Sequence, residues 1–260
     1  MDFIPRQFKI NAKNIIAIAS GKGGVGKSTF AVNYAVTLEK MGKKVGILDA
    51  DIYGPSIPRM MGISGRPETN DNKKMIPLVN YGIKCMSIGF LLDVETPAIW
   101  RGPMVMKALD QMFSGVEWGE LDYLVIDLPP GTGDAQLTLA QSSKLSGSII
   151  VSTPQDVALI DVRKGINMFK KVNVPVLGIV ENMSYFICDS CNKRHEIFSH
   201  GGAKKESEKS DITFLGELPI DQNIRIQSDQ GNPSCVIKKD SDISDIYLSI
   251  AEKIQKKINN

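Results

Sequence analysis

The chain has 260 residues, of which 42% are hydrophobic and 23% charged, a balance typical of a globular protein that excludes a fibrous or largely disordered one. Its 31 basic and 29 acidic residues leave a net charge of +2, so no overall field favours nucleic acid or an anionic membrane as a partner. The first residues lack the apolar segment of a signal peptide, and no apolar run has membrane-spanning length. We therefore expect a soluble, cytoplasmic protein with no nucleic acid partner and no membrane contact.

The first predicted elements are a strand over residues 14–19, a glycine-rich turn and a helix over residues 27–41. The turn has the Gly-x-x-x-x-Gly-Lys-Ser spacing of a phosphate-binding loop, in the strand-to-helix context that the pattern requires. Glycines let backbone N–H groups turn toward phosphate oxygens, and the helix N-terminus adds its dipole. The pattern predicts that Lys27 contacts the β- and γ-phosphates and that the Ser28 hydroxyl helps to hold Mg²⁺. The residues expected to bind the nucleotide here are Gly21, Gly23, Gly24, Val25, Gly26, Lys27, Ser28 and Thr29.

The second predicted strand, residues 44–49, leads into "DADIYGPSIP", which places Asp49 and Asp51 at the strand end. We expect Asp51 to orient the attacking water beside the γ-phosphate. Asp49, two residues earlier, is expected to support either the Mg²⁺ shell or the loop. The alternative is that one of the two merely caps a helix.

The predicted strand over residues 122–127 ends in Asp127, the position of a Walker-B carboxylate that holds Mg²⁺ directly or through water. The "PPGTGD" segment after it combines prolines with two glycines. Such a segment suits a switch whose conformation reports whether a γ-phosphate is present.

The remaining apolar runs and helical patterns alternate along the chain. Strands are predicted at 83–89, 147–152, 176–180 and 212–216, and helices at 102–114, 134–142, 156–171, 200–209, 221–229 and 242–258. This alternation predicts a doubly wound α/β fold with a mostly parallel sheet, helices on both faces and ligands at the carboxyl ends of the strands. Residues 62–80 are expected to form an exposed excursion. We expect a single domain over residues 1–260, with an N-terminal extension over 1–12 and a C-terminal helix within 242–260.

Three motifs, "GKGGVGKST", "DADIYGPSIP" and "DLPPGTGD", jointly resemble the Mrp/ApbC family of iron–sulfur carrier ATPases, in the deviant Walker-A class that includes MinD, ParA and the nitrogenase iron protein. The match runs from about residue 13 to about residue 235 and includes "IWRGPMVMKALDQ", "STPQDVALIDVRKG" and "GIVENMSYF". The resemblance implies an ATPase that acts as a homodimer with Mg²⁺, shares a [4Fe–4S] cluster between its chains and transfers it to apo-proteins. We expect hydrolysis to be slow, because a switch needs a lifetime.

The resemblance also assigns two further residues. It implies that Lys22, the additional lysine of the phosphate loop, reaches across the dimer interface to the partner's nucleotide and joins Lys27, Asp51 and Asp127 in catalysis. A merely solvated lysine is the alternative. It implies that Asn182 reads the adenine edge while residues 218–221 flank the base, although an ordinary turn asparagine is nearly as good an account.

Two of the four cysteines are expected to be buried thiols, Cys85 and Cys235. The other two, Cys188 and Cys191, form a CxxC pair with His195 and His200 close behind. The residues alone allow a redox pair, a single-chain zinc site that uses both histidines, or half of a four-thiolate site completed across a two-fold axis. The resemblance implies the last, with Cys188 and Cys191 as ligands of the shared cluster. The histidines are expected to cap or hydrogen-bond near the following helix.

Two other classes of function remain as alternatives. A positioning ATPase of the MinD/ParA kind would act on membrane or DNA, and the C-terminal stretch carries an apolar stripe flanked by lysines that can lie on lipid. We expect instead that this stripe packs against the sheet. The residues of the stripe are Ile243, Ile246, Tyr247, Ile250 and Ile254. A reductase that resembles the nitrogenase iron protein is disfavoured, because such proteins supply well-separated cysteines.

Overall fold

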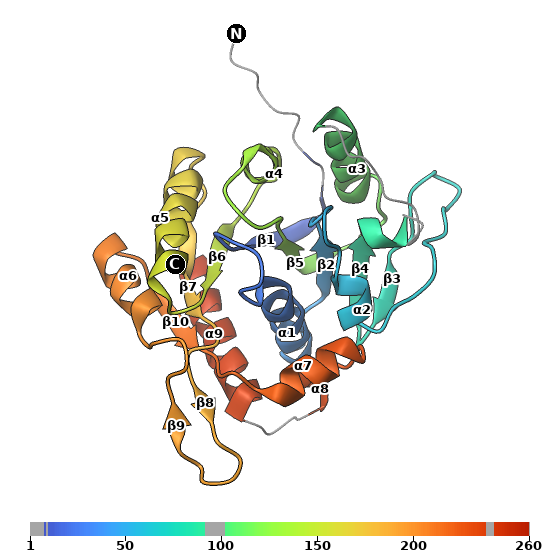
Figure 1. The fold of residues 1–260 in the computed structure, drawn as a ribbon. Coiled ribbons are helices and arrows are strands. Elements are labelled where there is room, and N and C mark those ends of the chain that lie inside the picture. Colours follow the sequence, from blue (N-terminus) through green and yellow to red (C-terminus); the bar gives the residue numbers. More distant parts are fainter. Residues whose placement is uncertain (1–7, 9, 92–101, 238–241, 260) are drawn as a thin grey trace.

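The computed structural model describes residue 8 and residues 10–91, 102–237 and 242–259. Within these residues, eight strands form one sheet in the order β10-β7-β6-β1-β5-β2-β4-β3 (Figure 1). Their bounds are β1 (Ala12–Ala19), β2 (Val45–Asp49), β3 (Leu78–Asn80), β4 (Ile83–Ser87), β5 (Leu121–Asp127), β6 (Gly147–Ser152), β7 (Val176–Glu181) and β10 (Phe214–Glu217). Neighbouring strands are parallel except for β3 and β4, so the predicted mostly parallel α/β sheet is confirmed.

Helices cover both faces of this sheet, with α3, α4 and α5 on one side and α1, α8 and α9 on the other (Figure 1). The helices, including the short 3₁₀ turn η1, are α1 (Lys27–Lys40), α2 (Ile57–Met60), η1 (Ile88–Phe90), α3 (Gly102–Ser114), α4 (Asp134–Ser142), α5 (Asp156–Lys171), α6 (Gly202–Ser210), α7 (Gln222–Asp229), α8 (Ser234–Ile237) and α9 (Asp242–Asn259). Because both faces are covered, the central strands are buried along nearly their whole length, which explains their continuous apolar runs.

The register of three central strands aligns the residues that sequence patterns single out. Ile18 of β1 pairs with Asp127 of β5, and Asp49 of β2 pairs with Asp127 from the other side. The phosphate loop after β1 and both carboxylates therefore meet at the same edge of the sheet, the edge where parallel α/β folds place their ligands.

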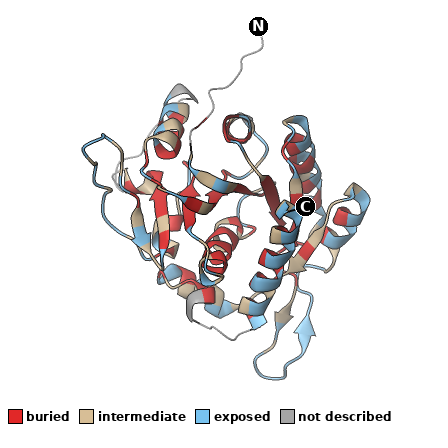
Figure 2. Ribbon diagram, turned by 180° about the vertical axis from the view of Figure 1, so that it is seen from behind, coloured by how far each residue is buried: buried red, intermediate tan, exposed pale blue. Residues whose placement is uncertain are grey.

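The apolar stripe of α9 faces the protein interior. Ile243, Tyr247, Ile250 and Ile254 are buried, and the Tyr247 ring stacks on Phe30 of α1 with 5.6 Å between ring centroids. In Figure 2 the buried residues of this helix line its inner side, while its outer side is exposed. The packed reading of the stripe is therefore confirmed. Among the described residues, no helix combines the length and the apolar character needed to cross a membrane.

Six short elements were not predicted: β3, α2, η1, α8 and the hairpin of β8 (Phe186–Ile187) and β9 (Arg194–His195). Each has two to four residues, too few to show a helical or alternating period. The turn η1 begins at Ile88, so the strand predicted over 83–89 ends earlier, at Ser87. The expected excursion over residues 62–80 is mostly exposed, but Leu78–Asn80 add an antiparallel edge strand to the sheet. Residues 99–101 of one family motif and most of the predicted N-terminal extension lie outside the described residues.

Candidate functional site

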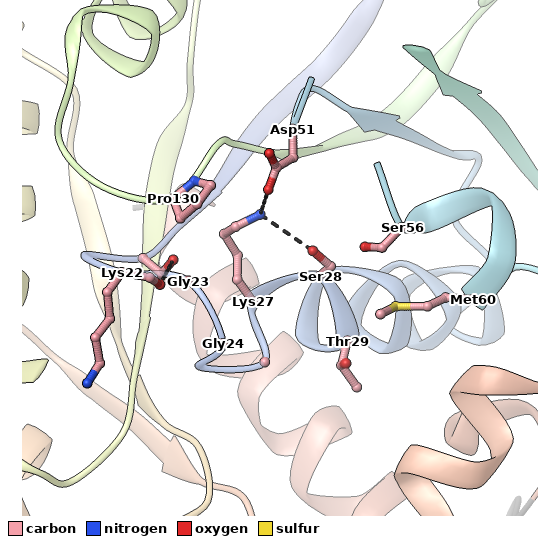
Figure 3. A pocket seen from close by; sticks show the side chains of 12 residues that line it. Lys22, Gly23, Gly24, Lys27, Ser28, Thr29, Asp51, Ser56, Met60 and Pro130 are labelled. Atoms are coloured by element: carbon pink, nitrogen blue, oxygen red, sulfur yellow. Dashed lines mark hydrogen bonds and ion pairs between the residues drawn. The ribbon is translucent and has the colours of Figure 1, made fainter. Parts of the chain in front are cut away.

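The turn between β1 and α1 lines a cavity of about 200 Å³ (Figure 3). Gly24 and Gly26 have φ angles of 79° and 83°, a left-handed conformation that favours glycine. A Cβ atom at Gly26 would also collide with the side chain of Asn182. Lys27, Ser28 and Asp51 border the cavity, so the structure brings the predicted phosphate loop and its carboxylate together.

Lys27, Ser28 and Asp127 form a tight cluster beside this cavity. The Lys27 ammonium donates to Asp127 Oδ1 at 2.6 Å, and the Ser28 hydroxyl donates to Asp127 Oδ2 at 2.5 Å. Burial raises the pKa of Asp127, while Lys27 and Ser28 oppose that rise. A hydroxyl and a carboxylate oxygen side by side are the ligand types that Mg²⁺ prefers.

Asp51 lies on the other side of the same ammonium group. Its Oδ2 atom is 3.7 Å from Lys27 Nζ, whereas its Oδ1 atom is buried and has no hydrogen-bond partner among the described residues. Burial raises the pKa of Asp51, and Lys27 acts against that rise. A buried acceptor without a donor is costly, so the geometry fits a water molecule or a hydrated cation at this position.

Asp49 supports the loop. It is fully buried and accepts hydrogen bonds from the Ser87 hydroxyl at 3.0 Å and from the backbone N–H groups of Asp51 and Ile57, both at 3.2 Å. Burial and the neighbouring Asp127 raise the pKa of Asp49 to about 7. Of the two roles expected for Asp49, these contacts are those of a residue that holds the β2–α2 loop.

Lys22 is the one lysine of the loop whose side chain leaves the cluster. Figure 3 shows it pointing away from Lys27, and the residue is partly exposed. Its backbone carbonyl accepts the Ser20 hydroxyl at 2.9 Å, which fixes the local turn. The ammonium group is therefore presented outside the cavity of its own chain.

Asn182 follows the last residue of β7 and lies against the phosphate loop. Its side-chain amide donates to the Val25 carbonyl at 2.8 Å, and its backbone N–H donates to the Ser152 carbonyl at 2.7 Å. The amide nitrogen of Asn182 thus lies against the loop that would hold the phosphates. The structure therefore places this predicted residue beside the phosphate loop.

Cys188 and Cys191 lie at the turn of the β8–β9 hairpin, which projects from the body of the protein (Figure 1). The turn closes through hydrogen bonds between the backbones of Cys188 and Lys193 at 3.0 Å and of Asn192 and Cys188 at 2.8 Å. Backbone N–H groups of Ser190 and Cys191 lower the pKa of the Cys188 thiol. The hairpin therefore presents two accessible sulfurs, one of them predisposed to ionise.

The structure does not assemble the single-chain zinc site. Across the described ranges, the one group of three metal-type side chains within mutual reach is Glu181, His200 and Glu217. His200 lies 3.0 Å from the Ser184 hydroxyl, just before α6, as expected for a hydrogen-bonding histidine. Cys85 and Cys235 are buried free thiols, also as expected.

Several residues at the site were missed by sequence reasoning. Met60 of the short helix α2 and Ser56, the residue just before that helix, reach the cavity, and Pro130 reaches it from the loop after β5. The "PPGTGD" motif was a signal for Pro130, whereas α2 is too short to give one.

Comparisons with known proteins agree with this geometry. A family model described as ParA, NUBPL iron-transfer P-loop NTPase, matches residues 11–255. The iron-sulfur cluster transfer protein NUBPL of Mus musculus is 50% identical over 260 residues, which cover 99% of this chain and 82% of that protein. The iron-sulfur cluster carrier protein of Aquifex aeolicus is 50% identical over 250 residues, which cover 95% and 69%.

Solved structures give the same result. The nucleotide-binding protein of Archaeoglobus fulgidus in complex with ADP has a TM-score of 0.79 and 43% identity, over 91% of this chain and 93% of that one. MinD of Pyrococcus furiosus has a TM-score of 0.68 at 22% identity, over 94% and 99%, and shows likeness of fold. The resemblance to iron–sulfur carrier ATPases is confirmed, and the chain belongs to the NUBPL iron-transfer family of P-loop NTPases.

Proposed function

We propose that this protein is an ATPase that carries an iron–sulfur cluster, with ATP binding and hydrolysis coupled to transfer of the cluster to apo-proteins. The observation that carries the proposal is the presence, in one chain, of a phosphate loop with its carboxylates and of an exposed CxxC turn. The names of the related carrier and transfer proteins support the cargo. Cys188 is partly exposed and Cys191 is exposed, so both sulfurs are accessible to a cluster.

The nucleotide chemistry follows from the cluster around Lys27. Phosphate oxygens would take the place of Asp127 as the partner of the Lys27 ammonium, because a phosphate group offers more negative charge. Asp127 and the Ser28 hydroxyl would then hold Mg²⁺, which neutralises charge on the transferred phosphoryl group. Asp51, with its unpartnered oxygen, would orient the attacking water.

A homodimer completes both sites in this proposal. One chain supplies two thiolates, half the number that a [4Fe–4S] cluster takes, and a two-fold axis beside the hairpin would supply the rest. Lys22 points out of its own cavity, which suits a cation that reaches the nucleotide of a second chain. The shared cluster thus has Cys188 and Cys191 of each chain as ligands.

Anaerobic reconstitution with iron and sulfide tests the proposal. The wild type should become brown, hold about two irons per chain and run as a dimer, because each chain supplies half of the ligands. Cys188→Ala should stay colourless, while Cys235→Ala, which removes a buried thiol away from the hairpin, should bind as the wild type does. A wild type that remains colourless and monomeric with ATP and Mg²⁺ would overturn the proposal.

A further inference from the structure

Five side chains meet at the base of the hairpin and form what we call the hairpin-base network: Glu181, Ser184, Arg194, His200 and Glu217. They come from the end of β7, the segment after it, β9, the residue pair before α6 and the end of β10. The network therefore joins four separate stretches of the chain, at residues 181–184, 194, 200 and 217.

Glu181 is the buried end of the network. Its carboxylate accepts the Ser184 hydroxyl at 2.6 Å and the backbone N–H groups of Gly201 and Ala203 at 3.0 and 2.7 Å. It thereby ties the end of β7 to the first turn of α6. A fully buried carboxylate with three donors is held in one orientation.

Arg194 is the end of the network that belongs to the hairpin. Its guanidinium donates to Glu217 Oε1 at 3.2 Å, lies 3.2 Å from the Nδ1 atom of His200 and stacks over the Tyr185 ring at 4.0 Å. Ser184 links the two ends, because its hydroxyl oxygen is within 3.2 Å of both His200 and Glu217. Arg194 directly follows Lys193, the backbone partner of Cys188.

Three members of the network, Glu181, His200 and Glu217, are residue types that bind metal ions. The hydrogen bonds that these residues make do not fit a metal site. Both oxygens of Glu181 already accept donors, and the Arg194 cation lies against His200 and Glu217. A divalent cation would have to displace these donors and would face the charge of Arg194. The arrangement is that of a positioning network.

The network begins one residue from the nucleotide site. Glu181 precedes Asn182, whose amide contacts the Val25 carbonyl and packs against Gly26 of the phosphate loop. A movement of the phosphate loop would therefore displace the end of β7 first, through Asn182. Packed, hydrogen-bonded groups transmit such a displacement because they have few alternative arrangements.

We propose that the hairpin-base network makes the position of the CxxC turn depend on the state of the phosphate loop. The inference rests on the proposed function, in which the loop binds ATP and the turn holds the cluster. A nucleotide that draws the Asn182 amide from Val25 shifts the end of β7, and the shift passes through Glu181 and Ser184 to Arg194. Glu217 and Ser184 are positioning residues, with no contact to the phosphate cavity.

Thiol modification of the reduced, cluster-free protein tests this coupling. The rates at Cys188 and Cys191 are measured with and without a non-hydrolysable ATP analogue and Mg²⁺, and analogue affinity is measured separately by fluorescence. In the wild type the analogue should change the rates about fivefold, the lower end of usual coupling between sites. In Glu217→Gln and Ser184→Ala the change should disappear while affinity stays the same.

Glu206→Gln is the matched control. Like Glu217→Gln, it removes a charged partner of an arginine, here the bidentate contact of Glu206 in α6 with Arg163 at 2.8 Å. This contact does not involve the hairpin. This variant should keep the nucleotide response. If Glu217→Gln unfolds, the uncharged Ser184→Ala variant decides, with thermal unfolding as the check on its fold.

Three results would overturn the inference: a wild type whose thiol rates ignore the nucleotide that it binds, a response that survives in both network variants, or zinc binding that persists without the two cysteines and vanishes in His200→Ala. Each of these leaves the proposed function intact, because that function is judged by iron incorporation and not by thiol rates. Failure of iron incorporation with a normal thiol response would do the reverse.

Discussion

The ammonium nitrogen of Lys27 lies 2.6 Å from the carboxylate of Asp127, and the side chains are 6% and 0% exposed. Such a pair is stable only while each charge has the other, since either one alone in the interior would be strongly penalised. The Lys27 side chain is thus already fixed in position, beside the cavity, when no phosphate is bound. In the proposed function, phosphate binding would exchange one anion for another around a fixed cation.

Lys27→Ala should weaken ATP binding by about 10-fold to 100-fold, the loss of one or two charge-assisted hydrogen bonds. Titration with a fluorescent ATP analogue measures the effect. Lys44→Ala is the control, because its ammonium is exposed and lies 4.0 Å from Glu120 at the surface. An unchanged affinity in Lys27→Ala would remove Lys27 from the binding site.

Asp51→Asn should retain ATP binding and lower the rate of hydrolysis by about 100-fold, the usual contribution of a group that directs proton transfer or water. The amide keeps the shape of the side chain but is a poor base. Phosphate release under saturating ATP is the measurement, with Asp229→Asn on the exposed face of α7 as the control. A loss of binding equal to the loss of rate would instead make Asp51 a ground-state contact.

Asp49 gives the protein a pH-dependent stability. Its pKa is raised from an ordinary value of 3.8 to about 7, so between these values the folded state binds more protons than the unfolded state. The contribution of Asp49 to the free energy of unfolding is therefore fully present below pH 3.8 and is lost as the pH rises through 7, by at most about 1.4 kcal/mol per pH unit.

Asp49→Asn cannot take up this proton. The stability difference between wild type and variant, measured by urea unfolding, should be larger at pH 5 than at pH 7. The control is Asp122→Asn, whose partly exposed carboxylate lies near the opposite end of β5 and has a pKa lowered from 3.8. This group is ionised in both the folded and the unfolded state between pH 5 and pH 7, so the stability difference for this variant should stay constant over that range. A constant difference across this range would mean that Asp49 does not titrate.

Cys188 should react faster than Cys191 with iodoacetamide near neutral pH. Hydrogen bonds from the Ser190 and Cys191 backbone lower the pKa of Cys188, and the thiolate is the reactive form. Mass spectrometry of partly alkylated protein gives the order of labelling, and buried Cys85 and Cys235 serve as internal controls that stay unlabelled. Earlier labelling of Cys191 would contradict the local geometry of the turn.

Ile250→Ala should lower the free energy of unfolding by about 2–5 kcal/mol, the cost of a large-to-small change in a packed core. Leu248 on the same helix is 39% exposed, so Leu248→Ala should change stability little. Chemical unfolding compares the two variants. Co-sedimentation with anionic liposomes completes the test. If the protein pellets with the liposomes in the presence of ATP, and does so through α9, a positioning ATPase would be favoured over a carrier.

The nucleotide site was largely predictable because parallel strands align their carboxyl ends. The patterns of residues 14–28 and 122–127 were enough to place Lys27, Ser28 and Asp127 at one edge of the sheet, and the structure joins all three. The role of Asp49 was not decided, because it depends on the Ser87 hydroxyl, which reaches it across the sheet from β4.

The cysteine hairpin and its base were beyond the reach of sequence patterns. Strands of two residues show no alternation, so residues 186–195 gave only the CxxC spacing. Glu181 lay at the end of an apolar run, with nothing to indicate that Ser184, His200 and Glu217 would gather around it. Such contacts depend on tertiary closure between segments up to 36 residues apart, from 181 to 217, which local propensity does not encode.

The hairpin leaves the protein and returns to it at nearly the same point, since the Ser184 hydroxyl and the His200 ring are only 3.0 Å apart. The residues between them therefore form a loop closed at its base, which the Arg194–Glu217 ion pair and the bridge between Phe186 and Ile220 join to the body of the protein. Because the two ends of this loop already lie together, a change in its length would not require β7 and α6 to move apart.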